Sequence, residues 1–366
     1  MVPLPAQGHL NQLLHLSRLV SAHDIPVHFV GTTTHNRQAK LRVHGWDPLS
    51  ISNFKSHDFP LHTFSNPPPD PNSSTKFPVQ IIPSLKSTTN LRKPIYNLVE
   101  KLSATVGKIV VIYDSLMPYV VQDISSIPNA ESYCFQSISA FSLYSFYWEG
   151  KGKPILATEA EIIRQVPSIE ECVPPELLEF SKIQEDAPKF NSGDIYNTSR
   201  VIEGLYVDLL AKEKTTGTDK IWAIGPFNPV SAPGKRDLTV RHKYLDWLDK
   251  LELNSVIFIS FGSTSSLSDE QINEIAFGLE RSEVKFIWVL RDADKGDIFA
   301  VKDWERRDEV ISSVRVEKAV RTLMRSAEGD EIRKIAAKLG DALKKSLMEG
   351  GETRKEMDSF VAHITR

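Results

Sequence analysis

The residues best suited to acid–base chemistry begin with a histidine near the start of the chain. Gly8 and His9 stand between the proline-rich stretch Pro3–Pro5 and the first turn of an amphipathic helix. Glycine lets a backbone approach a ligand closely, and the free amides of a helix N-terminus favour a negative group nearby. A histidine at this position can accept a proton from a hydroxyl group at neutral pH. The alternative is a histidine that caps the helix or packs in the core.

A carboxylate far along the chain is the candidate partner of this histidine. Asp114 ends the apolar stretch "IVVIYD", where a side chain faces a cleft rather than the core. It could hold the imidazole of His9 by its second nitrogen, which would fix the tautomer and stabilise the imidazolium. The alternative is that Asp114 is the N-cap of the helix that follows.

A third candidate is the segment from Ile259 to Ser268, "ISFGSTSSLS", which contains Ser263. A strand here opens into a turn rich in glycine and hydroxyl groups ahead of a helix, an arrangement that can cradle a phosphate. The segment is neither a Walker loop nor a GxGxxG motif. An ordinary strand-to-helix loop is therefore the alternative interpretation.

The elements that must position these residues follow an alternating pattern. Short runs rich in β-branched residues alternate with helical patterns, which is typical of parallel βαβ units and predicts an α/β fold. Ligands in such folds bind at the carboxyl ends of the strands. The predicted strands lie at 25–31, 107–114, 131–137, 193–199, 220–227, 255–262 and 285–291.

Two helices show a clear apolar side. The apolar side of the first helix comprises Leu10, Leu13, Leu14, Leu16, Leu19 and Val20. The last helix repeats apolar residues at i, i+3, i+4 and i+7, which predicts that one face docks on another part of the protein; these are Met357, Phe360, Val361 and Ile364. Ser268 and Gln271 form a predicted capping box at the start of a helix in the second half of the chain.

The length of 366 residues suits two domains of about 150–200 residues each. The segment 228–240 begins with "NPVSAPGKRD", whose proline and glycine content is typical of a linker. We therefore predict a first lobe over 1–227 and a second lobe over 241–366, which ends in charged helices.

Composition narrows the range of partners and compartments. The formal net charge is −3 without a long basic run, so nothing favours a nucleic-acid or membrane partner. The only two cysteines, Cys134 and Cys172, fit buried thiols in a reducing compartment. The sequence shows neither a secretory signal nor a run of about 18 apolar residues. We expect a cytoplasmic protein, and the oligomeric state stays open.

Several segments, taken together and in order, resemble one family. They are "PLPAQGHLNQLLHLS", "VVIYDSL", "NTSRVIEG", "WAIGPFNP", "WLD", "NSVIFISFGS" and "KFIWVLRDADKGDIF". The chain resembles the plant UDP-sugar-dependent glycosyltransferases, and within them the group of zeatin O-glucosyltransferases and O-xylosyltransferases. The stretch "TTTHNRQAKLRVHGWDP", from Thr32 to Pro48, strengthens the likeness to that group.

The resemblance implies a GT-B fold, with two Rossmann-like lobes that carry parallel sheets. It implies that the first lobe binds the acceptor and the second mainly the UDP-sugar, a co-substrate, so that no cofactor is needed. The implied reaction is an inverting, metal-independent transfer of a hexose or pentose to a hydroxyl of a small acceptor, such as the cytokinin zeatin. In it His9 deprotonates the acceptor, Asp114 supports His9, Gly8 and Ser263 contact the donor region, and Ser263 touches the diphosphate.

One segment of the family pattern has no match in this chain. The family box with a tryptophan that stacks on uracil, the HCGWNS stretch and an Asp-Gln pair would fall at a junction between Ala300 and Val301. Losing one stack, about 1–3 kcal/mol, and two bonds to charged oxygens, about 1.5–3 kcal/mol each, removes on the order of 5 kcal/mol of donor binding. This corresponds to more than about a thousandfold in affinity.

We therefore expect an incomplete second lobe and very poor sugar transfer. The alternative function is a truncated, inactive form that at most binds a small acceptor, and a non-functional fragment is a third hypothesis. A dehydrogenase is disfavoured, because no GxGxxG motif follows a strand and no acidic residue is placed for a ribose.

Overall fold

The structure is a computed structural model that describes residues 1–41, 47–60, 81–152, 175–188, 190–214, 217–227, 243–261, 267–290 and 310–366. The chain divides into two compact units. The first comprises Met1–Pro67, Val79–Pro229 and Asp341–Arg366, and the second comprises Pro68–Pro78 and Val230–Gly340.

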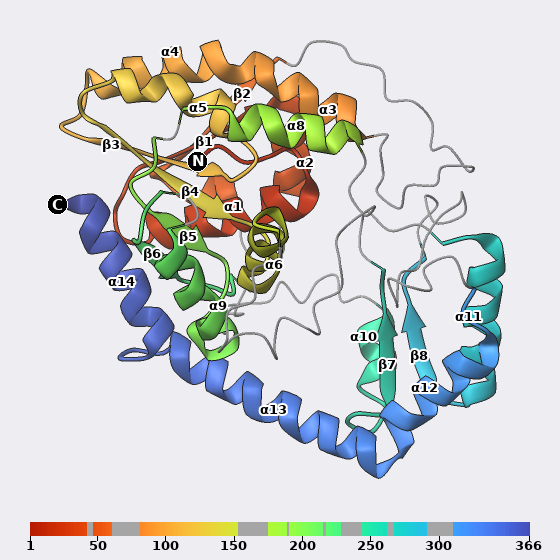
Figure 1. Ribbon diagram of the computed structural model, residues 1–366. Coiled ribbons are helices and arrows are strands. Elements are labelled where there is room, and N and C mark those ends of the chain that lie inside the picture. Colours follow the sequence, from red (N-terminus) through yellow and green to blue (C-terminus); the bar gives the residue numbers. More distant parts are fainter. Residues whose placement is uncertain are drawn as a thin grey trace. The chain divides into compact units, whose positions relative to one another are not determined.

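The first unit is built on parallel strands (Figure 1). They are β1 (Val27–Thr32), β2 (Phe54–Phe59), β3 (Ile109–Asp114), β4 (Ala130–Gln136), β5 (Asp194–Tyr196) and β6 (Ile221–Ala223). β1 pairs with β2, and the other four form one sheet in the order β3-β4-β5-β6. Residues 1–2 join the two: Met1 accepts from the amide of Val30 on β1 at 2.9 Å, while Val2 donates to the carbonyl of Ile112 on β3 at 2.8 Å and accepts from the amide of Asp114 at 3.0 Å. The predicted α/β class with parallel sheets is confirmed.

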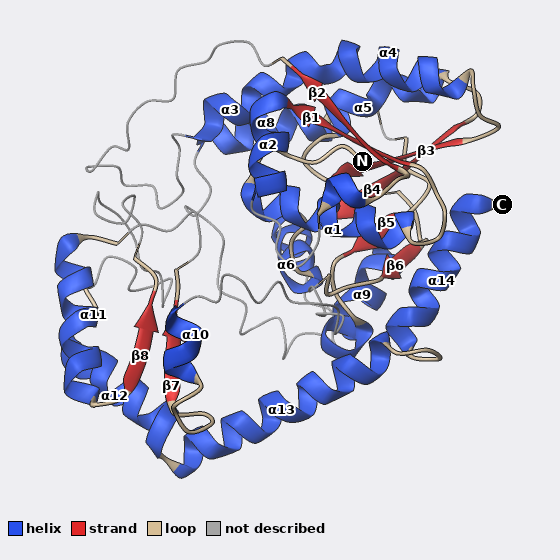
Figure 2. Cartoon of the chain, turned by 180° about the vertical axis from the view of Figure 1, so that it is seen from behind, coloured by secondary structure: helices blue, strands red, loops and turns tan. Residues whose placement is uncertain are grey.

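Helices cover both faces of the four-stranded sheet (Figure 2). Those of the first unit are α1 (Gln7–Ser21), α2 (Thr33–Leu41), α3 (Ile82–Ser87), α4 (Arg92–Ser103), α5 (Pro118–Val121), α6 (Ala140–Gly150), α8 (Pro175–Glu185), α9 (Arg200–Glu213) and α14 (Glu352–Thr365). Short 3-10 turns are η1 (Pro48–Ser50), η3 (Thr88–Leu91) and η4 (Gln122–Ser126). Ile112, Phe135 and Ile195 point towards α1 and α14, whereas Tyr196 and Ala223 point towards α6 and α9.

Helix α1 buries most of its predicted apolar side in this core. Leu10, Leu13, Leu14, Leu16 and Val20 are all buried. Leu19 is 38% exposed, so its predicted place on the apolar side is wrong. A residue directly before Val20 lies about 100° around the helix from it, which turns Leu19 away from the sheet.

The apolar face predicted for the last helix is confirmed. Met357, Phe360 and Ile364 on α14 are buried in the core of the first unit, where Phe360 packs edge-on against Tyr133 and Trp222. The predicted domain boundaries stay a prediction, because the linker 228–240 lies outside the described residues. The segment Asp341–Arg366 belongs to the first unit, although the sequence placed it with the second lobe.

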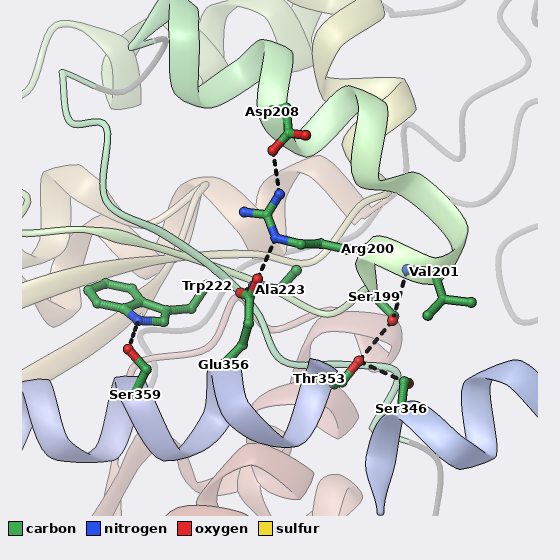
Figure 3. Close-up of polar contacts among 10 residues, drawn as sticks. All are labelled: Ser199, Arg200, Val201, Asp208, Trp222, Ala223, Ser346, Thr353, Glu356 and Ser359. Atoms are coloured by element: carbon green, nitrogen blue, oxygen red, sulfur yellow. Dashed lines mark hydrogen bonds and ion pairs between the residues drawn. The ribbon is translucent and has the colours of Figure 1, made fainter. Parts of the chain in front are cut away.

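Polar contacts also tie α14 to the sheet and to α9 (Figure 3). The carboxylate of Glu356 accepts from the backbone amide of Ala223 at 2.5 Å and from Nε of Arg200, whose guanidinium also bonds Asp208. Nearby, the hydroxyl of Thr353 lies 2.8 Å from that of Ser199 and 3.1 Å from that of Ser346. These contacts satisfy polar groups that the docking of α14 removes from water.

The second unit contains a small parallel sheet of two strands. Its elements are α10 (Lys243–Leu248), β7 (Val256–Ile259), α11 (Asp269–Ser282), β8 (Lys285–Trp288) and α12 (Ser313–Arg325), and α13 (Ala327–Leu347) follows. α11 and α12 cover one side of the sheet, with Leu267, Ile275 and Val320 buried between the layers. Phe258 on β7 is 65% exposed, which is unusual because parallel sheets are normally covered on both faces.

The predicted capping box at the start of α11 is half formed. Ser268 accepts from the amide of Gln271 at 3.1 Å, as predicted. The side chain of Gln271 does not return to Ser268, because it bonds both backbone groups of Ile311, at 3.0 and 2.7 Å. A tertiary partner with two bonds therefore replaces the local one.

Of the helices in the described ranges, none has the length and hydropathy needed to cross a bilayer.

The contacts of Glu356 predict a measurable stability difference between two acidic residues of α14. Glu356→Ala removes two charge-assisted bonds in a partly buried site, and we expect a loss of about 2–3 kcal/mol in the free energy of unfolding. The matched control is Asp358→Ala on the same helix, which removes an exposed pair with Arg354 and is expected to cost less than about 1 kcal/mol. Urea unfolding followed by circular dichroism measures both, and equal losses would contradict the role assigned to Glu356.

Candidate active site

Three polar side chains stand where neighbouring strands end. Asp114 is the last residue of β3, and Ser137 and Asn197 directly follow β4 and β5. In the register Asp114 pairs with Phe135, and Phe135 pairs with Ile195. Because side chains alternate along a strand, residues two positions further on stay on the same face. Asp114, Ser137 and Asn197 therefore share the face on which α1 packs.

His9 reaches this edge from the first turn of α1. Its Nδ1 lies 2.7 Å from Oδ2 of Asp114, 105 positions away in the sequence. The carboxylate is fully buried and the imidazole is 21% exposed. The structure thus brings together the two residues that were paired from the sequence. Asp114 also accepts from the amide of Leu116 at 3.0 Å through Oδ1. It is not the N-cap of the following helix, because α5 has Met117 at that position and no side-chain capping bond.

A third side chain contacts the same nitrogen. Oγ of Ser137 lies 2.6 Å from Nδ1 of His9. The bond to the Asp114 carboxylate is charge-assisted and therefore the stronger of the two, which places the proton on Nδ1. Neither contact uses Nε2, so its lone pair is left to take a proton from another group. Ser137 was not singled out from the sequence. Its position directly after β4 is the signal that could have identified it, because Asp114 was identified by its position at the end of β3.

The surroundings of His9 move its pKa in two directions. Burial lowers the pKa, whereas the charge of Asp114 and the hydrogen bond to it raise the pKa. The net result is a pKa above the ordinary value of 6.5. The imidazolium form is therefore stabilised, as a group that takes up a proton during a reaction requires.

The other predicted site residues have different outcomes. Gly8 lies in the first turn of α1, and a Cβ built on it would have no atom within 4 Å, so packing does not demand glycine there. Ser263 lies outside the described residues, as does the junction between Ala300 and Val301. Within the described ranges, no group of three or more His, Cys, Asp or Glu side chains is arranged to hold a metal ion.

Comparisons with known proteins place this chain in a family. The family described as "Glycosyltransferase, N-terminal domain" matches residues 1–229, which include His9, Asp114 and Ser137. The zeatin O-glucosyltransferase of Phaseolus lunatus is 40% identical, over all of this chain and 96% of the relative. The zeatin O-xylosyltransferase of Phaseolus vulgaris is also 40% identical, over all of this chain and 97% of the relative.

Solved structures agree on the fold. UGT73P12 of Glycyrrhiza uralensis, complexed with glycyrrhetinic acid 3-O-monoglucuronide, matches with a TM-score of 0.75 and 18% identity, over all of this chain and 94% of that one. UGT2 of Phytolacca americana, complexed with UDP-2fluoro-glucose and pterostilbene, matches with a TM-score of 0.72 and 16% identity, over all of this chain and 99% of that one. The fold is therefore GT-B, the fold of a nucleotide-sugar glycosyltransferase. The chain belongs to the plant UDP-glycosyltransferase family.

This chain is shorter than its alignment with the Phaseolus lunatus relative. The Phaseolus lunatus relative aligns over 452 positions, whereas this chain has 366 residues. The relative therefore has residues with no counterpart in this chain. That the difference falls between Ala300 and Val301 stays a prediction.

The geometry around His9 predicts the effect of removing the charge of Asp114. In Asp114→Asn, burial is no longer opposed by the carboxylate, so we expect the pKa of His9 to fall below its ordinary value. Because the folded-state pKa of His9 is raised, the pair contributes stability that is fully present below the unfolded pKa and is lost as the pH rises through the folded pKa. The variant is expected to lack this pH-dependent contribution.

The measurement is a titration of the His9 ring by nuclear magnetic resonance, with unfolding free energies at pH 5.5 and about 8.5. Asp123→Asn is the control, since Asp123 pairs with Arg92 rather than with a histidine of the site. A His9 pKa that is the same in Asp114→Asn and in the unchanged protein would contradict the electrostatic role of Asp114.

Proposed function

We propose that His9 is the general base of a UDP-sugar-dependent O-glycosyl transfer to a small hydroxylated acceptor, namely a cytokinin such as zeatin. The observation that carries this proposal is the contact of 2.7 Å between the imidazole of His9 and the buried carboxylate of Asp114. Nδ1 is occupied by Asp114, and Nε2 is free to take the proton.

The proposed reaction follows from this arrangement. Nε2 of His9 takes the proton of the acceptor hydroxyl while the acceptor oxygen forms a bond to the anomeric carbon. The bond from that carbon to the diphosphate oxygen breaks, and UDP leaves with the electron pair. Attack from the side opposite to the leaving group inverts the anomeric centre. Asp114 stabilises the imidazolium that forms, so its role is to favour the charged state of His9.

The acceptor and the sugar are assigned on different grounds. Both relatives at 40% identity are named for zeatin, which supports a cytokinin acceptor. One is named a glucosyltransferase and the other a xylosyltransferase, so the sugar is either a hexose or a pentose. For the donor, we propose that Ser263 contacts the diphosphate and that Gly8 leaves room beside the base. A cytoplasmic location agrees with the free, buried thiol of Cys134.

A second candidate function is binding of the acceptor without efficient transfer. It is favoured by the alignment of 452 positions against 366 residues, because the relative has residues that this chain lacks. If those residues include the donor-binding box, the binding free energy of the UDP-sugar is weaker by on the order of 5 kcal/mol, whereas the acceptor site is intact.

The experiment that tests the proposal is a single-turnover assay with excess protein, zeatin and either UDP-glucose or UDP-xylose. We expect slow formation of zeatin O-glycoside, and we expect His9→Ala to lower its rate by about 10²–10⁴-fold because the base is removed. The control is His23→Ala, whose ring lies beyond the end of α1 and outside the site.

Each outcome separates the two candidates. Glycoside formation that survives His9→Ala would overturn the role of His9. Heat of zeatin binding in a calorimeter, together with no glycoside at any protein concentration, would favour the second candidate. If neither binding nor glycoside is detected, both candidates are wrong.

A further inference from the structure

We infer that Gln12 is a positioning residue for His9. A directed chain of amide hydrogen bonds runs from the backbone of Phe227 through Asn197 and Gln12 to the carbonyl of Ser137, and holds the Ser137 hydroxyl against the imidazole. This inference rests on the proposed role of His9 as the base. It adds three residues to the site, Gln12, Asn197 and Ser137, that none of the sequence arguments identified.

The chain consists of three hydrogen bonds of ordinary length. The amide of Phe227 donates to Oδ1 of Asn197 at 2.8 Å. Nδ2 of Asn197 donates to Oε1 of Gln12 at 2.9 Å, and Nε2 of Gln12 donates to the carbonyl of Ser137 at 2.9 Å. We call these three bonds the amide relay. Its last member is the residue whose hydroxyl lies 2.6 Å from Nδ1 of His9.

The direction of the amide relay is fixed at both ends. The backbone amide of Phe227 can only donate, and the backbone carbonyl of Ser137 can only accept. If either side-chain amide were flipped, two acceptors or two donors would face each other in the relay. Each side-chain amide therefore has one orientation, and the position of each depends on the next. Such a chain restrains a loop more strictly than a single bond with a rotatable hydroxyl.

Helix geometry explains why Gln12 reaches the same loop as His9. Residues three positions apart are neighbours on a helix surface, so His9 and Gln12 project from the same side of α1. His9 meets the hydroxyl of Ser137, and Gln12 meets its carbonyl. Because both groups belong to one residue, fixing the carbonyl also fixes the point from which the hydroxyl extends.

The other end of the Ser137 loop is anchored independently. The carboxylate of Glu203 accepts from the amides of Ala140 and Phe141, at 3.0 and 3.1 Å, where α6 begins. The loop is thus held by Gln12 at its first residue and by Glu203 at the start of the following helix. This fixes the backbone from which the Ser137 hydroxyl extends while the relay is intact.

The consequence concerns the orientation of the base. A single bond from Nδ1 to Asp114 allows the ring to swing about that contact, whereas a second oxygen at 2.6 Å restricts the swing. The direction in which Nε2 points depends on this restriction, and displacements of about 1 Å can cost a hundredfold in rate. The relay therefore acts on reactivity through orientation, without touching a substrate.

The test compares two glutamines that make the same kind of bond. Gln12→Met keeps the length of the side chain and removes the bonds to Ser137 and Asn197. Gln122→Met is the matched control, since Nε2 of Gln122 also donates to a backbone carbonyl, that of Tyr119 at 2.8 Å, outside the relay. The first readout is the titration of the His9 ring by nuclear magnetic resonance, which does not depend on turnover.

We expect Gln12→Met to lower the pKa of His9, because the protonated ring loses one of the two oxygens that face Nδ1. Where the unchanged protein forms glycoside, we expect kcat to fall by about ten- to a hundredfold with KM within about twofold. The control is expected to leave both values unchanged. A smaller folded fraction would also lower the apparent kcat at constant KM, but it would leave the His9 pKa of the folded protein unchanged, so the titration separates the two causes.

A second variant tests the relay at another link. Asn197→Leu keeps the shape of the side chain and adds no charge, but it has neither an N–H for Oε1 of Gln12 nor an acceptor for the amide of Phe227, so nothing fixes the orientation of the Gln12 amide. We expect the same shift of the His9 pKa as in Gln12→Met. The double variant is expected to show no larger shift than either single variant, because both break one chain.

The outcomes distinguish this inference from the proposed function. A His9 pKa that is unchanged in both single variants would overturn the relay, whether or not the protein forms glycoside. Shifts that add in the double variant would overturn it as well. If the unchanged protein forms no glycoside while the His9 pKa responds to both variants, the proposed function is wrong and the relay stands. If Gln12→Met does not fold, Asn197→Leu decides alone.

Discussion

A shift of one residue in the pairing of β3 with β4 would turn either Asp114 or Ser137 towards α6 and α9. In the observed register Asp114 pairs with Phe135 and Phe135 pairs with Ile195, so Asp114 and Ser137 face α1. The fully buried rings and aliphatic groups of that face then lock the register through the core shared with α1. The position of the polar side chains at the end of the sheet therefore depends on the apolar packing of the same face.

Helix α14 protects the same register at the β6 edge of the sheet. β6 is the last strand of the four-stranded sheet, and an edge strand leaves backbone groups without a partner. Glu356 accepts from the amide of Ala223 on this strand, while Arg200 balances its charge. Helix α14, from the end of the chain, thus covers the edge of a sheet whose strands all come from the first two-thirds of the chain. The site and the C-terminal helix depend on the same four strands.

Sequence patterns predicted some of these features and could not reach others. Apolar runs located the described strands except β2, whose sequence FKSHDF is largely polar, and periodicity located the buried face of α14. The ends of strands singled out Asp114 as a partner for His9. The sequence did not identify Ser137, Gln12 and Asn197. Hydroxyl and amide side chains are common, and their hydrogen bonds become apparent only when the fold brings them together. Gln271 was assigned a local bond for the same reason, since its tertiary partner Ile311 is 40 residues away. The role of Ser263 stays a prediction.

The nitrogen of Asn197 that donates to Gln12 has a further chemical significance. Asn197, Thr198 and Ser199 form an Asn-Xaa-Ser acceptor sequence, in which an oligosaccharide would be attached through that nitrogen. A glycan added during synthesis in the secretory pathway would place a bulky group where the Gln12 side chain lies. The geometry around His9 is therefore compatible only with an unmodified Asn197. Synthesis in a compartment without N-glycosylation preserves the amide contacts at this edge of the sheet.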